Sequence, residues 1–146
     1  SPVSEFKFRI RHTGLPVADL DRTIDFYTRL LGMDIMRLRN APEQNLRAAY
    51  LGYGSEDEGP GLEMIEHGGP DKNKQMPAWA GHMAILPSDI YKLCEILKKE
   101  GVCITDEPRP NRPGSKDHVG WIKDPDGYSI ELTERHTLTG PPVKRT

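Results

Sequence analysis

The sequence predicts an α+β fold that is built from two tandem βαβββ modules. Each half of the chain reads as one strand, one helix and three further strands. Matching residues of the two halves lie 68 to 70 positions apart: His12 and His82, Gly32 and Gly101, Glu63 and Glu131. A βαβββ unit leaves one sheet face uncovered, so two such units are expected to pack together, within one chain or across a dimer.

The first module is expected to span about residues 6–67 and to open with a strand at residues 12–17. A helix should follow, because apolar residues recur at helical spacing and form one buried stripe; they are Leu20, Ile24, Tyr27 and Leu31. Asp19 or Asp21 is expected to cap this helix, and Gly32 to end it. Three strands complete the module, at residues 33–38, 47–53 and 61–66, with turns at residues 40–42 and 54–59.

The second module, about residues 81–136, repeats this order. A strand at residues 81–86 precedes a helix that Ser88 or Asp89 caps and Gly101 ends, with a buried stripe of Ile90, Leu93, Cys94 and Leu97. Strands are expected at residues 102–106, 118–123 and 128–134, with a turn at residues 124–127. Because 146 residues are too few for two independent domains, residues 6–136 are expected to form a single domain, followed by a C-terminal tail at residues 137–146.

Composition narrows the class of partner. The 20 basic and 22 acidic residues are mixed along the chain, which gives no basic footprint for a nucleic acid or an anionic membrane. No apolar run approaches the roughly 20 residues of a membrane span, and no secretory signal is evident. A small-molecule substrate and a cytoplasmic location are therefore expected. Cys94 and Cys103 are expected to be buried, reduced thiols without a redox or metal role.

Each half carries one histidine in its first strand and one glutamate in its last strand. His12 lies 51 residues before Glu63, and His82 lies 49 residues before Glu131. Both glutamates interrupt apolar strands, so alternation directs each to the face opposite its immediate neighbours. A single such glutamate would more simply be solvent-exposed on an edge strand. The matched pairs instead predict a catalytic site of two imidazoles and two carboxylates, a ligand set that suits a zinc, nickel, cobalt or iron ion with a vacancy for water or substrate.

An ordered set of short motifs runs along both modules. They are His12-Thr13 with Val17 and Asp19-Leu20, Thr23-Ile24-Asp25-Phe26-Tyr27 with Leu31-Gly32-Met33, Gly52-Tyr53-Gly54, Gly81-His82, and Asp124-Pro125-Asp126-Gly127-Tyr128 leading into Ile130-Glu131-Leu132. In this set, over nearly all of residues 10–135, the sequence resembles glyoxalase I (lactoylglutathione lyase), a carbon–sulfur lyase that removes methylglyoxal. The resemblance implies a vicinal oxygen chelate (glyoxalase-like) fold.

The same resemblance implies a site and a mechanism. His12, Glu63, His82 and Glu131 match the four metal ligands of the family, and the short stretch between Glu63 and His82 is similar to the subgroup that uses nickel or cobalt, with zinc as an alternative. Members are commonly homodimers whose paired modules complete each site. The implied reaction converts the hemithioacetal of methylglyoxal and glutathione into a 2-hydroxyacyl thioester through a metal-bound enediolate, with Glu131 or Glu63 as the catalytic base.

Two positions depart from the family pattern. Pro16 stands where the family has an arginine, and His67 stands where it has an asparagine, and both family residues contact glutathione. Glutathione or another thiol is therefore the expected co-substrate. His67 is a candidate substrate contact, and so are Arg109, Arg112 and Lys116, which are expected in a flap-like loop before the seventh strand, and Trp121. Trp79 is a further aromatic candidate for the pocket.

Other functions remain open at this level. An epimerase or isomerase of another 2-oxo or acyl compound would keep the metal and the enediolate, and Pro16 and His67 favour it. Extradiol dioxygenases usually present two histidines and one glutamate, so Glu63 disfavours that chemistry. A metal-free protein that binds a drug or metabolite is disfavoured by the four intact ligands.

Overall fold

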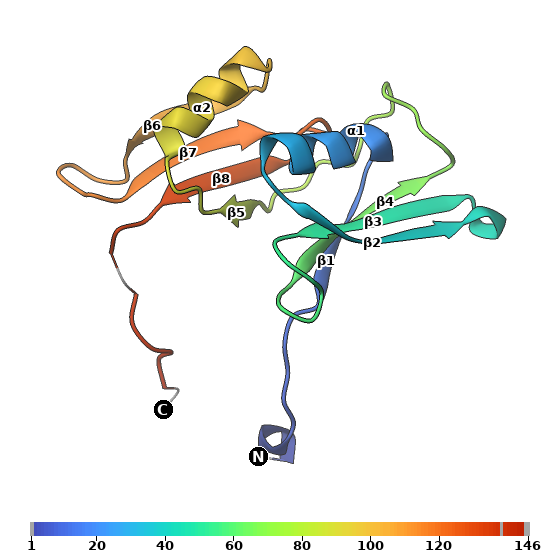
Figure 1. Ribbon diagram of the computed structural model, residues 1–146, viewed down its shortest axis with the longest axis horizontal. Coiled ribbons are helices and arrows are strands. Elements are labelled where there is room, and N and C mark those ends of the chain that lie inside the picture. The colour runs from blue at the N-terminus through green and yellow to red at the C-terminus, as the bar shows by residue number, and fades with distance from the viewer. Residues whose placement is uncertain (1, 138, 145–146) are drawn as a thin grey trace. The chain divides into compact units, whose positions relative to one another are not determined.

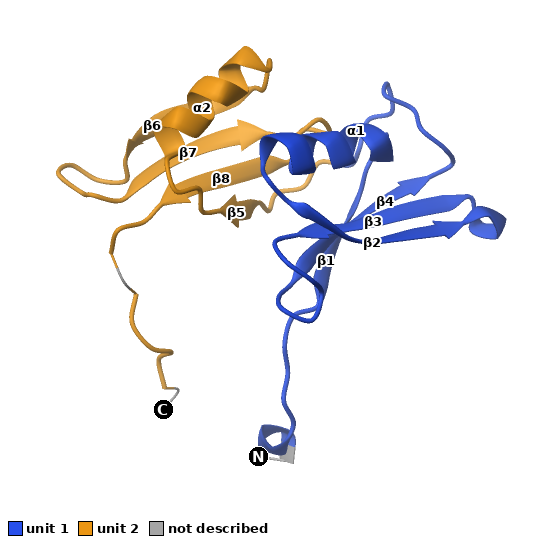
Figure 2. Ribbon diagram, in the orientation of Figure 1, with its two compact units in different colours: residues 1–77 blue, residues 78–146 orange. Residues whose placement is uncertain are grey.

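The computed structural model describes residues 2–137 and 139–144. The chain divides into two compact units, residues 1–77 and 78–146 (Figure 2). Each unit contains one four-stranded mixed sheet and one principal helix, labelled in Figure 1. Within the described residues, no helix is long and apolar enough to cross a membrane.

In unit 1 the sheet has the order β1-β4-β3-β2. After a short 3-10 helix, η1 (Pro2–Glu5), the elements are β1 (His12–Pro16), α1 (Leu20–Asp25), η2 (Phe26–Leu30), β2 (Asp34–Ala41), η3 (Pro42–Gln44), β3 (Leu46–Gly52) and β4 (Gly61–His67). Strands β1 and β4 are parallel, and the other neighbours are antiparallel. Helix α1 packs on β3 and β4, where Met64 and Leu51 are fully buried.

Unit 2 repeats this topology as β5-β8-β7-β6. Its elements are β5 (Met83–Ile85), α2 (Ile90–Lys99), β6 (Ile104–Pro110), β7 (His118–Lys123) and β8 (Ser129–Glu134). Strands β5 and β8 are parallel, and the other neighbours are antiparallel. Helix α2 packs on the sheet through Ile90 and Leu97, which are fully buried. Two βαβββ units with the same strand order confirm the predicted fold class.

The two helices start in the same way. The carboxylate of Asp19 accepts a hydrogen bond from the backbone N–H of Arg22 (3.1 Å), and that of Asp89 accepts one from Lys92 (3.0 Å). Of the alternatives that the sequence left open, Asp19 and Asp89 are thus the caps. A glutamate of the last strand also holds each first helical N–H: Glu66 accepts from Leu20 at 2.6 Å, and Glu134 accepts from Ile90 at 2.8 Å.

Several boundaries differ from the prediction. The first helix is α-helical only to Asp25 and continues as the π-helix η2, where the hydroxyl of Thr28 donates to the carbonyl of Ile24 (2.7 Å). Strand β2 runs on to Ala41, because its pairing with β3 continues to the turn at η3. Cys103 is exposed rather than buried, whereas Cys94 is buried as predicted, and both are free thiols.

Strand β6 also runs further than predicted and ends at Pro110. It is the edge strand of its sheet, and its pairing with β7 shifts register twice, at residues 104–106 and 106–109, so it accommodates Pro108 and Pro110. The extension places Arg109 in a strand rather than in the predicted loop. Arg112 and Lys116 do lie in the loop between β6 and β7, and the backbone hydrogen bond from Asn111 to Asp117 (3.0 Å) closes that loop.

Candidate metal centre

One face of each sheet carries the predicted ligands. In β4, Met64 and Glu66 are buried under α1, so alternation directs Glu63, Ile65 and His67 to the opposite face. Strand β1 adds His12 and Gly14 to this face, because Gly14 is the register partner of Glu63. We call this the open face of unit 1.

His12 and Glu63 lie side by side on the open face. The Nε2 atom of His12 is 3.6 Å from Oε1 of Glu63, longer than a direct hydrogen bond. The Nδ1 atom of His12 is buried and has no hydrogen-bond partner among the described residues. Gly14 lies beside the carboxylate, and a Cβ atom there would be in ordinary van der Waals contact with Oε1 of Glu63, at 3.6 Å. Because the imidazole and the carboxylate are close but not hydrogen-bonded to each other, both can be ligands of one metal ion.

The second oxygen of Glu63 has a partner in β3. Tyr50 is the register partner of Glu63, and its hydroxyl donates a hydrogen bond to Oε2. Burial, and then the hydrogen bond to the Glu63 carboxylate, raise the pKa of the Tyr50 phenol, so the phenol is a donor at neutral pH. The ring also makes an edge contact with His12, with centroids 5.3 Å apart.

Unit 2 places the equivalent residues in the same arrangement. His82 immediately precedes β5, and its Nε2 atom is 4.0 Å from Oε1 of Glu131 in β8. Glu131 is the register partner of Ala84, as Glu63 is of Gly14. Trp121 in β7 is the register partner of Glu131 and makes an edge contact with His82, with ring centroids 4.8 Å apart. The predicted four-residue site therefore consists of two matching His–Glu pairs, one in each unit.

Within the described residues, no group of three or more His, Cys, Asp or Glu side chains lies close enough together to hold a metal ion. Each pair supplies one imidazole nitrogen and one carboxylate within its own unit. Two nitrogens and two carboxylate oxygens are the donors that a borderline divalent ion accepts, so the chemistry of the four residues fits such an ion.

Some of the predicted substrate contacts lie beside the His–Glu pairs, and others lie in β6 or in the loop that follows it. His67 follows Glu63 by four positions in β4 and is exposed on the open face, and Trp121 is half-buried beside His82. Arg109 pairs with Val119 across β6 and β7, but its guanidinium is bound by the carboxylate of Asp106 at 3.0 Å. Arg112 and Lys116 are exposed in their loop, and Trp79 is exposed with an edge contact to Tyr128.

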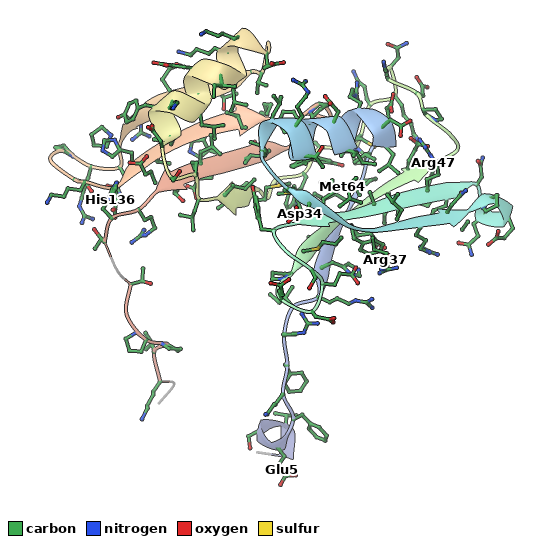
Figure 3. All side chains as sticks on the ribbon, in the orientation of Figure 1. Glu5, Asp34, Arg37, Arg47, Met64 and His136 are labelled. Atoms are coloured by element: carbon green, nitrogen blue, oxygen red, sulfur yellow. The ribbon has the colours of Figure 1, made fainter. Side chains whose placement is uncertain are left out.

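Sequence reasoning did not find Tyr50 or Arg37. Arg37, labelled in Figure 3, projects from β2 and lies over the Tyr50 ring, with its guanidinium carbon 3.7 Å from the ring centroid. The signal was available in the repeat. Tyr50 and Trp121 lie 71 positions apart, close to the offset of 70 between His12 and His82, and each is the register partner of the glutamate of its module. Aromatic residues in strands are so common in cores that this correspondence carried no weight without the register.

Comparisons with known proteins agree with this geometry. Residues 9–132 match the profile of the Glyoxalase/Bleomycin resistance protein/Dioxygenase superfamily. A probable lactoylglutathione lyase from Vibrio cholerae is 41% identical over 126 residues, which cover 86% of this chain and 90% of that protein. The chain belongs to the glyoxalase I family. The predicted family is thus confirmed, and with it the class of enzyme, a carbon–sulfur lyase.

Solved glyoxalase I structures have the same fold. The enzyme from Zea mays superimposes with a TM-score of 0.78 and 40% identity, over 87% of this chain and 44% of the maize chain. The trypanothione-dependent glyoxalase I of Leishmania major gives a TM-score of 0.74 and 36% identity, over 88% of this chain and 87% of that one. The chain spans only 39% and 46% of the length of two plant relatives, so it corresponds to part of those longer proteins.

Proposed function

We propose that this chain is a divalent-metal-dependent lactoylglutathione lyase that isomerises the hemithioacetal of a 2-oxoaldehyde, such as methylglyoxal, to a 2-hydroxyacyl thioester. The observation that carries the proposal is the repetition of one His–Glu pair at equivalent positions of two βαβββ units, in a chain 41% identical to a probable lactoylglutathione lyase. His12, Glu63, His82 and Glu131 would hold the ion, which we expect to be nickel or cobalt, with zinc as an alternative.

When bound, the ion would supply the positive charge that acidifies the carbon next to the substrate carbonyl. The residues of this chain would then hold the substrate and move one proton. We assign the proton transfer to Glu131. Glu63 is committed through one oxygen to the Tyr50 hydroxyl, whereas Glu131 accepts no side-chain hydrogen bond from the described residues. A carboxylate without such a partner can turn toward the substrate carbon, accept the proton and return it to the neighbouring carbon.

We also propose that the active form is a homodimer. A sheet with one open face needs a second layer, and two modules can supply it within one chain or across two chains. Light scattering should give twice the 16.5 kDa mass of one chain. A mass of one chain at working concentration, with full activity, would refute the dimer.

Positions 16 and 67 bear on which thiol the enzyme uses. Pro16 and His67 replace an arginine and an asparagine of the family pattern, and a glycyl or glutamyl carboxylate of glutathione is best held by a bidentate arginine. Pro16 has no polar side-chain atom and no backbone N–H. The Arg109 guanidinium, a candidate to replace the missing arginine, is paired with the Asp106 carboxylate at 3.0 Å.

We therefore expect a low kcat/KM for the glutathione-methylglyoxal hemithioacetal. It should be about a hundredfold below that of an enzyme with the same metal site and with the arginine and asparagine of the family pattern, because each lost charge-assisted contact costs roughly 1.5–3 kcal/mol. The double variant Pro16→Arg/His67→Asn should recover much of this loss. Rates with glutathione, trypanothione and simple thiols, in nickel- and cobalt-loaded protein, provide the measurement.

Two outcomes would change the assignment. A kcat/KM near 10⁶ M⁻¹s⁻¹ or more with glutathione, on the usual enzyme scale, would show that Pro16 and His67 do not weaken thiol binding. No turnover with any thiol, together with turnover of a thiol-free 2-oxo or acyl compound, would replace the lyase by the isomerase or epimerase alternative.

A further inference from the structure

We propose that Tyr50 is a positioning residue for Glu63: its hydroxyl occupies one carboxylate oxygen, so that the other is held ready for the metal ion. Arg37 and Glu56 support the phenol in turn. The inference rests on the proposed metal-dependent function, and it concerns how strongly the site binds its ion rather than which substrate it uses.

The contacts of Glu63 divide its two oxygens between two tasks. Oε2 accepts the hydrogen bond of the Tyr50 hydroxyl, while Oε1 points toward Nε2 of His12 at 3.6 Å. A free carboxylate rotates about its last bond and presents either oxygen or both. With Oε2 committed, Glu63 is expected to offer the ion a single oxygen, the one that lies next to the imidazole.

Tyr50 is itself held from three sides. The residue is 4% exposed, and its ring makes an edge contact with His12 on one side. On another side lies the Arg37 guanidinium, with its central carbon 3.7 Å from the ring centroid, which is the geometry of a cation–π contact. The third constraint is the backbone, since Tyr50 is paired with Arg37 in β2 and with Glu63 in β4.

Arg37 is fixed in the same way by Glu56, from the segment between β3 and β4. The Nε atom of Arg37 lies 3.2 and 3.3 Å from the two carboxylate oxygens of Glu56. Arg11 lies 3.5 Å from the same carboxylate, and the side chain of Arg9 donates to the Glu56 carbonyl at 2.7 Å. A continuous row of contacts thus runs from Glu56 through Arg37 and Tyr50 to Glu63.

Unit 2 shows what the site is like without this row. Trp121 occupies the place of Tyr50, opposite Glu131 and against His82. Its indole can donate only from Nε1, and Glu131 accepts no side-chain hydrogen bond within the part of the chain that the structure describes. The two His–Glu pairs have equivalent positions in their sheets but differ in their carboxylates. A phenol orients the carboxylate of Glu63, and no such group orients that of Glu131.

Removal of the Tyr50 hydroxyl should therefore weaken metal binding. Loss of a group that orients a metal ligand typically lowers affinity 10- to 100-fold, and we expect about tenfold for Tyr50→Phe. The substitution keeps the ring, its contact with His12 and the Arg37 stack. Tyr53→Phe is the matched control, because it removes a hydroxyl that donates to the Leu31 carbonyl (2.6 Å) in the same unit and does not contact Glu63.

The test is a competition titration of the metal-free chain with cobalt(II), followed by the visible absorption bands of the bound ion, which report the ligand arrangement directly. We expect Tyr50→Phe to bind cobalt about tenfold more weakly than the wild type and with shifted bands. Tyr53→Phe should stay within twofold of the wild type and keep its spectrum. Arg37→Met, which removes the support but leaves the hydroxyl, should lie between the two.

Two results would overturn the inference. Equal affinity and an unchanged spectrum for Tyr50→Phe, with a wild type that binds cobalt, would refute the positioning role and leave the proposed function intact. Failure of the wild type to bind any divalent ion would refute both. If Tyr50→Phe lost its fold, Arg37→Met would decide alone, and wild-type affinity and spectrum in that variant would count against the role.

Discussion

We expect Glu131→Gln to lower kcat by about 10³-fold, within the 10²–10⁴ range of a positioned general base, while the hemithioacetal still binds. Glutamine keeps the length and an oxygen ligand but cannot accept a proton. Glu63→Gln should also reduce kcat, chiefly through weaker metal binding, so that excess nickel or cobalt restores part of its activity. Excess metal should not rescue Glu131→Gln.

The comparison is made on kcat at saturating metal and substrate, with the metal content of each variant measured in parallel. The opposite pattern, a Glu63→Gln variant that is fully loaded but inactive beside an active Glu131→Gln variant, would show that the base is Glu63. Tyr53→Phe again serves as the control, because Tyr53 follows β3 in unit 1 and its hydroxyl donates to the Leu31 carbonyl rather than to a predicted ligand.

The largest effect on stability is expected for Arg47→Met. The Glu66 side chain is 1% exposed and lies under α1, and Arg47 binds both of its oxygens, at 3.0 and 2.9 Å. Loss of the guanidinium leaves a buried carboxylate whose remaining partner is the N–H of Leu20. Such a loss costs 3–5 kcal/mol in general, and we expect about 3 kcal/mol here, because a cavity of about 250 Å³ beside the pair can admit water.

Denaturant unfolding of metal-free protein measures this loss. The double variant Arg47→Met/Glu66→Gln should regain part of the lost stability, since the amide can still accept from Leu20 and no buried charge is left unpaired. Arg39→Met changes an exposed arginine of the neighbouring strand and should cost less than about 0.5 kcal/mol. A loss below that value for Arg47→Met would contradict the importance of the pair.

Much of the fold was predictable because the chain repeats. The offset between His12 and His82 identified the two modules, and apolar spacing with an aspartate cap identified both helices. Glu66 and Glu134 were not distinguished from surface glutamates, although they occupy matching positions. Their role depends on a hydrogen bond to a helix start that lies 46 and 44 residues earlier in the chain, and no local pattern encodes such a contact.

The candidate site was likewise predictable only in part. The identity of His12, Glu63, His82 and Glu131 followed from residue type and repeat position, and the structure places them in two matching pairs. The roles of Tyr50 and Arg37 did not follow, because cross-strand register determines which β2 and β3 side chains meet Glu63. The bulge at Met36 changes that register by one residue, and it is this shift that brings Arg37 opposite Tyr50.

The central claim is that the two His–Glu pairs together hold one catalytic divalent ion. Elemental analysis of purified protein, paired with activity before and after exhaustive chelation, tests it most directly. The account predicts one ion per chain, that is, one for every two His–Glu pairs. Chelation should abolish turnover, and addition of nickel or cobalt should restore it. His82→Ala and Glu63→Gln should be deficient in metal. Full activity in protein shown by elemental analysis to be free of metal would contradict it.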